Sequence, residues 1–134
     1  MDALQHFETV GKRGYFRPRG SVSLAQAVAM IDAALGFACA RGLREVVVNV
    51  TGLSGFASPP VSERFYFIMR WATTIHGRVR LAVVVRPEFI DPERFGVTVA
   101  VNRGLEAEVF VSEADAIAWL ERKPADRVPL RTSS

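Results

Sequence analysis

Hydroxyl side chains gather between residues 50 and 62, and they are the groups of this chain best placed to do chemistry. Thr51, Ser54 and Ser58 follow an apolar run, and Ser62 comes after Pro59 and Pro60. Hydroxyls in such a loop can cap free backbone N–H groups. They can also accept a phosphate, or help to hold an anion at the start of a helix. The sequence is compatible with both roles for Ser58, the capping of a backbone N–H group and phosphorylation.

The usual motifs of enzymes and metal sites are absent from the sequence. Neither His6 nor His76 has Cys, Asp or Glu at the spacing of metal ligands. The run Gly-Leu-Ser-Gly at residues 52–55 misses the Gly-x-Ser-x-Gly nucleophile motif by one residue. We therefore expect no metal, no cofactor and no catalytic activity.

Composition favours one globular domain. The chain has 134 residues, of which 49% are hydrophobic, and a formal net charge of +3. We expect a domain over residues 1–123 and a flexible tail over residues 124–134, where two prolines precede Thr-Ser-Ser. The single cysteine, Cys39, fits a reducing cytoplasm. No apolar run is long enough to span a membrane.

Basic residues near both ends of the chain account for much of the positive excess. No basic helix face is interleaved with aromatic side chains, and no RNA-binding signature is present. We therefore interpret these charges as solvated surface groups and expect no nucleic-acid partner.

Hydrophobic periodicity predicts strands that alternate with helices. Three apolar runs predict parallel strands at residues 46–50, 79–85 and 108–111, and two earlier runs predict a hairpin with strands at residues 6–10 and 15–19 and a loop at residues 11–14. Helices are expected from Ser21 or Ser23 to about Ala40, and after Pro60, Pro92 and Ser112. The predicted fold class is α/β, with a single, mainly parallel sheet of about five strands, an antiparallel edge strand and four helices.

This fold would gather charged residues around the hydroxyl-rich loop. In open α/β sheets, ligands and partners bind beyond the carboxyl ends of the strands. There we expect positive charge from Arg19, Arg64 and Arg86, with Glu88 and Asp91 on the rim. The alternative is that these side chains pair with one another, as surface charges often do.

Aromatic residues of the second helix form a separate group. Phe67 and Trp71 are four residues apart and lie off the face that holds Ile68, while Phe56 precedes the helix. A helix that is apolar nearly all round is either buried or covers a partner. This pattern is as compatible with an interface or a ligand groove as it is with ordinary burial. The interface could be with another protein or with a second copy of this chain.

With these elements placed, residues 5–122 resemble the STAS domain, the fold of the bacterial SpoIIAA-like anti-sigma-factor antagonists. The resemblance rests on Arg-Pro-Arg-Gly at residues 17–20, on Val-Val-Val-Asn-Val-Thr-Gly-Leu at residues 46–53, and on the order of strands and helices. Residues 102–105, 109–110 and 116–120 resemble the closing strand and helix of the family.

In the regulatory STAS members, the loop after the central strand carries Asp-Ser-Ser-Gly, whose first serine is phosphorylated by a partner kinase. Aligned through Asn49 and Gly52, that motif falls on residues 57–60, which read Ala-Ser-Pro-Pro. Ser58 keeps the hydroxyl, but the flanking residues differ. The resemblance implies a non-catalytic regulatory module that binds a protein partner at this loop and the following helix. The alternative is a carrier of a small ligand such as a lipid or nucleotide.

Overall fold

The computed structural model describes residues 5–57, 59–75, 77–89 and 106–122. Five strands form the main sheet, in the order β1-β2-β4-β6-β7. The bounds are Phe7–Val10 for β1, Arg13–Phe16 for β2, Glu45–Asn49 for β4, Arg80–Val84 for β6 and Glu106–Phe110 for β7. Strand β1 pairs antiparallel with β2, and the other neighbours are parallel. The predicted mixed sheet with an antiparallel edge is confirmed.

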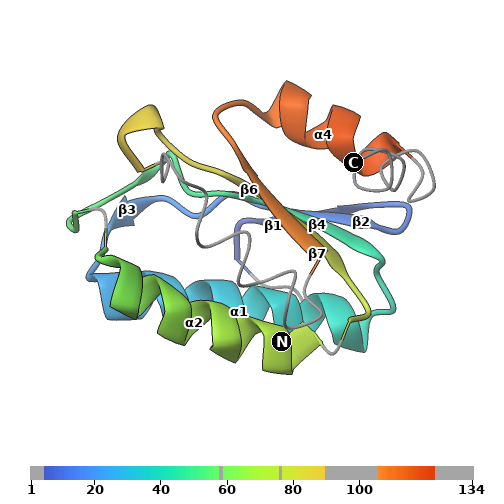
Figure 1. Ribbon diagram of the computed structural model, residues 1–134. Helices are drawn as coiled ribbons and strands as arrows, with labels where there is room; N and C mark the ends of the chain where they lie inside the picture. Colours follow the sequence, from blue (N-terminus) through green and yellow to red (C-terminus); the bar gives the residue numbers. More distant parts are fainter. Residues whose placement is uncertain (1–4, 58, 76, 90–105, 123–134) are drawn as a thin grey trace, which may run out of the picture.

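Within the described residues, three α-helices cover the two faces of this sheet (Figure 1). Helices α1 (Leu24–Ala40) and α2 (Val61–Ile75) lie side by side on one face, and α4 (Glu113–Glu121) lies on the other. A 3-10 turn, η1 (Pro87–Phe89), follows β6. The fourth helix expected after Pro92 falls outside the described residues, as does the expected tail.

The central strand β4 is buried on both faces, as its apolar sequence predicts. Val46 and Val48 pack into the core formed with α1 and α2, whereas Val47 packs beneath α4. This alternation follows from the two-residue period of side chains along a strand. The sheet therefore separates two hydrophobic cores.

Helix α1 begins and ends where the sequence predicts. Ser23 accepts a hydrogen bond from the Gln26 backbone N–H, while the Gln26 side chain accepts one from the Ser23 N–H, which is a capping box. Gly42 follows the helix with a φ of 71°, a conformation that glycine adopts at little cost.

The predicted hairpin is correct in type but wrong in its second strand. Val10 pairs directly with Arg13, so the turn contains only Gly11 and Lys12. Arg13 belongs to β2, where it pairs with Val10 of β1 and Glu45 of β4, and its side chain binds Glu45 with Nε and Oε1 2.8 Å apart. The strand ends at Phe16, which leaves residues 17–19 outside the ladder.

Charged residues alternate in sign across the beginnings of four neighbouring strands. Arg13 lies opposite Glu45, Glu45 opposite Arg80, and Arg80 opposite Glu106. Arg80 also donates hydrogen bonds to the carbonyls of Leu120 and Trp119, at 2.9 and 3.2 Å. This charge row therefore joins the strands to one another and to the end of α4.

Candidate functional site

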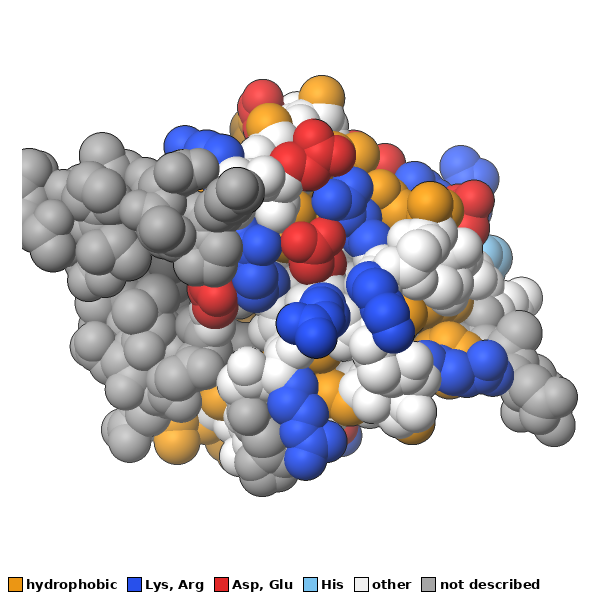
Figure 2. All heavy atoms as spheres, turned by 90° about the vertical axis from the view of Figure 1, so that its right-hand side faces the viewer, with side chains coloured by type: hydrophobic (Ala, Val, Ile, Leu, Met, Phe, Trp, Pro, Cys, Tyr) orange, Lys and Arg blue, Asp and Glu red, His pale blue; other side chains and the backbone are white. Residues whose placement is uncertain are grey.

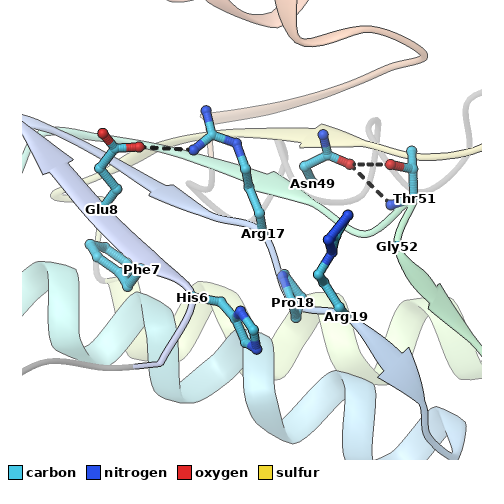
Figure 3. A pocket seen from close by; sticks show the side chains of 9 residues that line it. All are labelled: His6, Phe7, Glu8, Arg17, Pro18, Arg19, Asn49, Thr51 and Gly52. Carbon is cyan, nitrogen blue, oxygen red and sulfur yellow. Dashed lines mark hydrogen bonds and ion pairs between the residues drawn. The ribbon is translucent and has the colours of Figure 1, made fainter.

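An open hollow of about 550 Å³ lies at the carboxyl edge of the sheet (Figure 3). It is lined by residues 6–8 at the start of β1, residues 17–19 after β2, and Asn49, Thr51 and Gly52 at the end of β4. Figure 3 shows that Arg17 and Arg19 extend in the same general direction, as side chains two residues apart on an extended chain do. The hollow thus lies at the edge where the sequence predicted a site.

Arg17 is held by two carboxylates. Its Nε and Nη2 donate to the two oxygens of Glu113, at 2.8 and 3.0 Å, and its Nη1 donates to Glu8 at 3.0 Å. The guanidinium also lies 4.8 Å from the centre of the Tyr15 ring. The two-pronged contact with Glu113 fixes the direction of the Arg17 side chain, because a guanidinium and a carboxylate match in geometry.

Glu113 joins Arg17 to the end of β4. Its Oε2 also accepts a hydrogen bond of 2.8 Å from Nδ2 of Asn49. Asn49 Oδ1 in turn accepts hydrogen bonds from Thr51, at 3.0 Å from the backbone N–H and 2.7 Å from the hydroxyl. A chain of contacts therefore runs from the first turn of α4 to the loop after β4.

The Glu113 carboxylate is stabilised in its charged form. The hydrogen bonds from Arg17 are the largest effect that lowers the pKa of Glu113; the hydrogen bond from Asn49 adds to it, and partial burial opposes both. The position of Glu113 in the first turn of α4 also favours negative charge. The network is thus ionised at neutral pH.

Arg19 presents the available positive charge of the hollow. Its side chain is exposed, and it makes no ion pair or hydrogen bond within the part of the chain that the structure describes. Arg17, by contrast, is neutralised by Glu8 and Glu113. The hollow therefore offers one free guanidinium beside the exposed Thr51.

The two loops at this edge are tied together by a second, two-stranded sheet. Strand β3 (Gly20–Ser21) pairs in parallel with β5 (Leu53–Ser54), and the Val22 N–H donates to the Ser54 carbonyl at 2.8 Å. Gly55 follows with a φ of 101°, and a Cβ there would lie 2.5 Å from the Val22 carbonyl oxygen. The expected irregular loop is therefore partly a strand, which holds Thr51 and Ser54 in fixed places.

The predicted site residues fall into separate groups. Arg19 and Thr51 line the same hollow, and Ser54 is exposed on the neighbouring β5. Phe56 instead packs on Phe89 of η1, with ring centres 5.8 Å apart.

Arg86 and Glu88 pair with each other at this second position. Their closest atoms, Nε and Oε2, are 3.5 Å apart, and the Arg86 guanidinium lies 5.1 Å from the Phe89 ring centre. This is the mutual pairing that the sequence left open as the alternative. Arg86 therefore adds little uncompensated charge to the site.

Trp71 is a core residue, so of the two interpretations that the sequence leaves open for it, burial is the correct one. Only 7% of its surface is exposed, and its indole N–H points at the Val28 carbonyl of α1, 3.4 Å away. Phe67 is partly buried against it, with ring centres 4.8 Å apart. The neighbouring Tyr66 is 70% exposed instead. Phe67 and Trp71 thus contribute to the packing of α2 on α1.

Three predicted site residues are not placed. Ser58 and Asp91 lie outside the described residues, and the Arg64 side chain lies outside them too, although its backbone belongs to α2. Their proposed roles stay predictions.

Sequence reasoning missed the residues that organise the hollow. The sequence patterns indicate Arg17 and Asn49 only as parts of the family resemblance, and they do not predict Glu8 or Glu113 as site residues. Glu113 lies 96 positions from Arg17, so no local spacing connects the two. One sequence feature does point to Glu113. It is the first residue of a helix capped by Ser112 at the carboxyl edge, and the helix dipole stabilises an acidic side chain at that position.

The described residues contain no group of three or more His, Cys, Asp or Glu side chains able to hold a metal ion. None of the helices among them is long and apolar enough to cross a membrane.

Comparisons with known proteins show the fold. No protein-family model matches the sequence, and no curated protein matches it. The NMR structure of the protein TM1081 matches with a TM-score of 0.51 at 10% identity, over 90% of this chain and 91% of TM1081. The anti-sigma factor antagonist SpoIIAA in its unphosphorylated form matches with a TM-score of 0.47 at 18% identity, over 85% of this chain and 93% of its own. The likeness to TM1081 shows a shared fold.

Proposed function

We propose that this chain is a non-catalytic, STAS-like interaction module that binds a protein partner at the carboxyl edge of its sheet. The observation that carries the proposal is the contact chain Arg17–Glu113–Asn49–Thr51. This chain fixes the loop after β4 while Thr51 itself stays exposed. A preorganised loop loses little entropy when it binds a partner, which favours recognition.

The charge of the hollow indicates what the partner presents there. Arg17 is compensated by its carboxylates, whereas Arg19 is exposed and unpaired among the described residues. A partner carboxylate, or a phosphate on either protein, would find a two-pronged donor in Arg19. The exposed Thr51 and Ser54 hydroxyls supply further donors and acceptors.

Capture experiments with matched variants test this proposal. The purified chain, its Arg19→Glu/Thr51→Glu variant and an Ala25→Glu/Ala29→Glu control would each be used to capture proteins from extract of the source cells. Ala25 and Ala29 are exposed on α1, so the control adds acidic side chains elsewhere. We expect at least one protein to bind the wild type and the control and to be lost from the site variant. Equal capture by all three chains would refute the proposal.

A finer proposal makes Ser58 the switch residue. Phosphorylation would add nearly two negative charges to a loop flanked in sequence by Arg64, and would change partner affinity. Intact mass measured after incubation with cell extract tests the modification, and Ser58→Ala tests its effect on capture. If no phosphate is added and Ser58→Ala captures the same proteins, Ser58 is not the switch. The proposal that a partner binds at the hollow beside Arg19 is unaffected by that result.

The hollow itself favours a second candidate function, the carriage of a small anionic ligand. Its volume of about 550 Å³ would hold a small molecule, and Arg19 would pair with an anionic group. Native mass spectrometry of freshly purified protein separates the two functions, because a carrier retains a small molecule that Arg19→Ala releases. A spectrum of the bare chain alone speaks against carriage.

The homodimer suggested by the aromatic pattern loses its main support. Trp71 is buried against α1, so Phe67 and Trp71 do not form an exposed apolar surface. A foreign protein partner is therefore the better reading.

A further inference from the structure

Basic side chains gather at the opposite edge of the sheet, where the parallel strands begin. Figure 2 shows this face, with Lys and Arg side chains grouped around a few acidic ones. Lys12 precedes β2, Arg44 precedes β4, and Arg78 lies two residues before β6. All three side chains are exposed. We call Lys12, Arg44 and Arg78 the amino-edge cations.

Backbone hydrogen bonds hold Lys12 next to Arg44, and they hold Arg44 next to Arg80, two residues after Arg78. The Arg44 N–H donates to the Lys12 carbonyl at 2.8 Å, and the Arg80 N–H donates to the Arg44 carbonyl at 2.9 Å. Neighbouring strands lie about 4.8 Å apart, so the three cations precede three adjacent strands at the same edge of the sheet.

These three side chains add uncompensated positive charge to this edge. Glu45 is bound to Arg13 and Arg80, and Glu106 lies 3.3 Å from the Arg80 guanidinium. Within the described residues, none of the amino-edge cations makes an ion pair or a side-chain hydrogen bond. Glu45 and Glu106 are thus paired with Arg13 and Arg80 and not with the amino-edge cations.

Helix ends explain only part of this arrangement. Helices α1 and α2 end near this edge, and cations stabilise the negative end of a helix dipole. That effect fades beyond the last turn, whereas Arg44 lies four residues past the end of α1. Lys12 belongs to a hairpin turn and caps no helix.

An exposed apolar side chain lies beside the cations. Val10 is 57% exposed, pairs with Arg13 across the hairpin, and stands two residues before Lys12. The edge therefore combines three cations with an apolar contact point, which suits a ligand that carries both carboxylates and apolar groups.

We propose that the amino edge is a second docking surface, which binds an acidic, amphipathic helical segment of another protein. Carboxylates one helical turn apart are spaced by about 5–6 Å, close to the spacing of the strands that carry the cations. No exposed aromatic side chain among the described residues at this edge offers a stacking platform for bases. An acidic peptide thus fits better than a nucleic acid.

The test uses a synthetic, dye-labelled 20-residue helical peptide that carries Glu at every fourth position and Leu beside it. Its affinity is measured by fluorescence anisotropy for the wild type and for the Lys12→Gln/Arg44→Gln/Arg78→Gln variant. A matched control, Ala25→Glu/Ala29→Glu/Ala33→Glu, lowers the net charge equally at exposed positions of α1. Thermal unfolding of each variant shows that it is folded.

We expect the amino-edge variant to bind the peptide about tenfold more weakly, and the α1 control to bind within twofold of the wild type. The swap Lys12→Arg/Arg44→Lys should keep the affinity. Equal weakening in both triple variants would reduce the effect to net charge and overturn the proposal, as would no measurable binding by the wild type. Tighter binding of a 20-nucleotide DNA strand or of phosphatidylserine vesicles would overturn it too. The carboxyl-edge capture experiment is independent of all these outcomes.

Discussion

Arg17 and Glu113 lie 96 residues apart in the chain, yet two hydrogen bonds of 2.8 and 3.0 Å join the guanidinium of one to the carboxylate of the other. The contact ties the segment after β2 to the first turn of α4. Because Asn49 binds the same carboxylate, one side chain sets the position of three segments. Glu113 is therefore the residue whose loss should loosen the carboxyl edge most.

Replacing Glu113 with Gln should lower the free energy of unfolding by about 1 kcal/mol, since Arg17 is partly exposed and solvent weakens the charge contribution. Glu8→Gln is the control, because Glu8 also binds Arg17 but is largely exposed. Its effect should be less than half as large. Urea denaturation measures both, and equal losses would contradict the central role of Glu113.

Acidification should remove the contribution that Glu113 makes to the free energy of unfolding. The contact with Arg17 lowers the pKa of Glu113 in the folded chain, so its stabilising effect is complete above the unfolded value of about 4.3. The effect is lost as the pH falls through the folded pKa below that value. The difference in unfolding free energy between wild type and Glu113→Gln should thus be constant from pH 7 to about 5 and shrink below about 4. A difference that does not shrink at all on acidification would show that it has another origin.

Gly55→Ala should destabilise the chain more than Gly11→Ala does. Both glycines have a positive φ, but a Cβ at Gly55 would lie 2.5 Å from the Val22 carbonyl oxygen, whereas nothing lies within 4 Å of one at Gly11. We expect a loss of about 1 kcal/mol at Gly11 and roughly 2–3 kcal/mol at Gly55. Thermal denaturation compares the two. The Gly55 variant should also lose protection of the Val22 N–H against hydrogen exchange, because the β3–β5 pair opens.

Trp71 and Tyr66 distinguish the buried and exposed sides of α2. Trp71→Ala should cost about 3–5 kcal/mol, because it removes a buried ring that packs on α1. Tyr66→Ala should change the unfolding free energy by less than about 0.5 kcal/mol, since Tyr66 is exposed. Chemical denaturation of the two variants measures the difference. Similar losses would mean that both faces of α2 are packed in solution.

The main elements could be predicted because short-range patterns define them. The capping box at Ser23 and Gln26, the apolar run of β4 and the alternation of strands with helices each lie within a few residues of sequence. Right-handed crossovers then leave few ways to order parallel strands. Sequence patterns thus carry the fold class and most element bounds.

The location of the candidate site could be predicted from the sequence, but most of the residues that organise it could not. The carboxyl edge follows from the topology, and Arg19 and Thr51 do line the hollow there. The partners that orient them come from long-range contacts, such as Asn49 with Glu113, which no local spacing reveals.

Trp71 shows a different limit. A helix that is apolar nearly all round is compatible with burial and with an interface, and only the packing of α2 on α1 decides between them. The β3–β5 pair was missed for a similar reason, because two-residue strands carry no periodicity.

The charge row at the beginnings of the strands has a consequence for assembly of the sheet. Across β2, β4, β6 and β7 the signs read plus, minus, plus, minus. If β4 and β6 exchanged places, Arg13 would face Arg80 and Glu45 would face Glu106, and like charges on adjacent strands repel. These four charged side chains thus favour the native order of the strands. The apolar side chains of β4 and β6 are similar, so packing in the core alone would discriminate less against a sheet with the two strands exchanged.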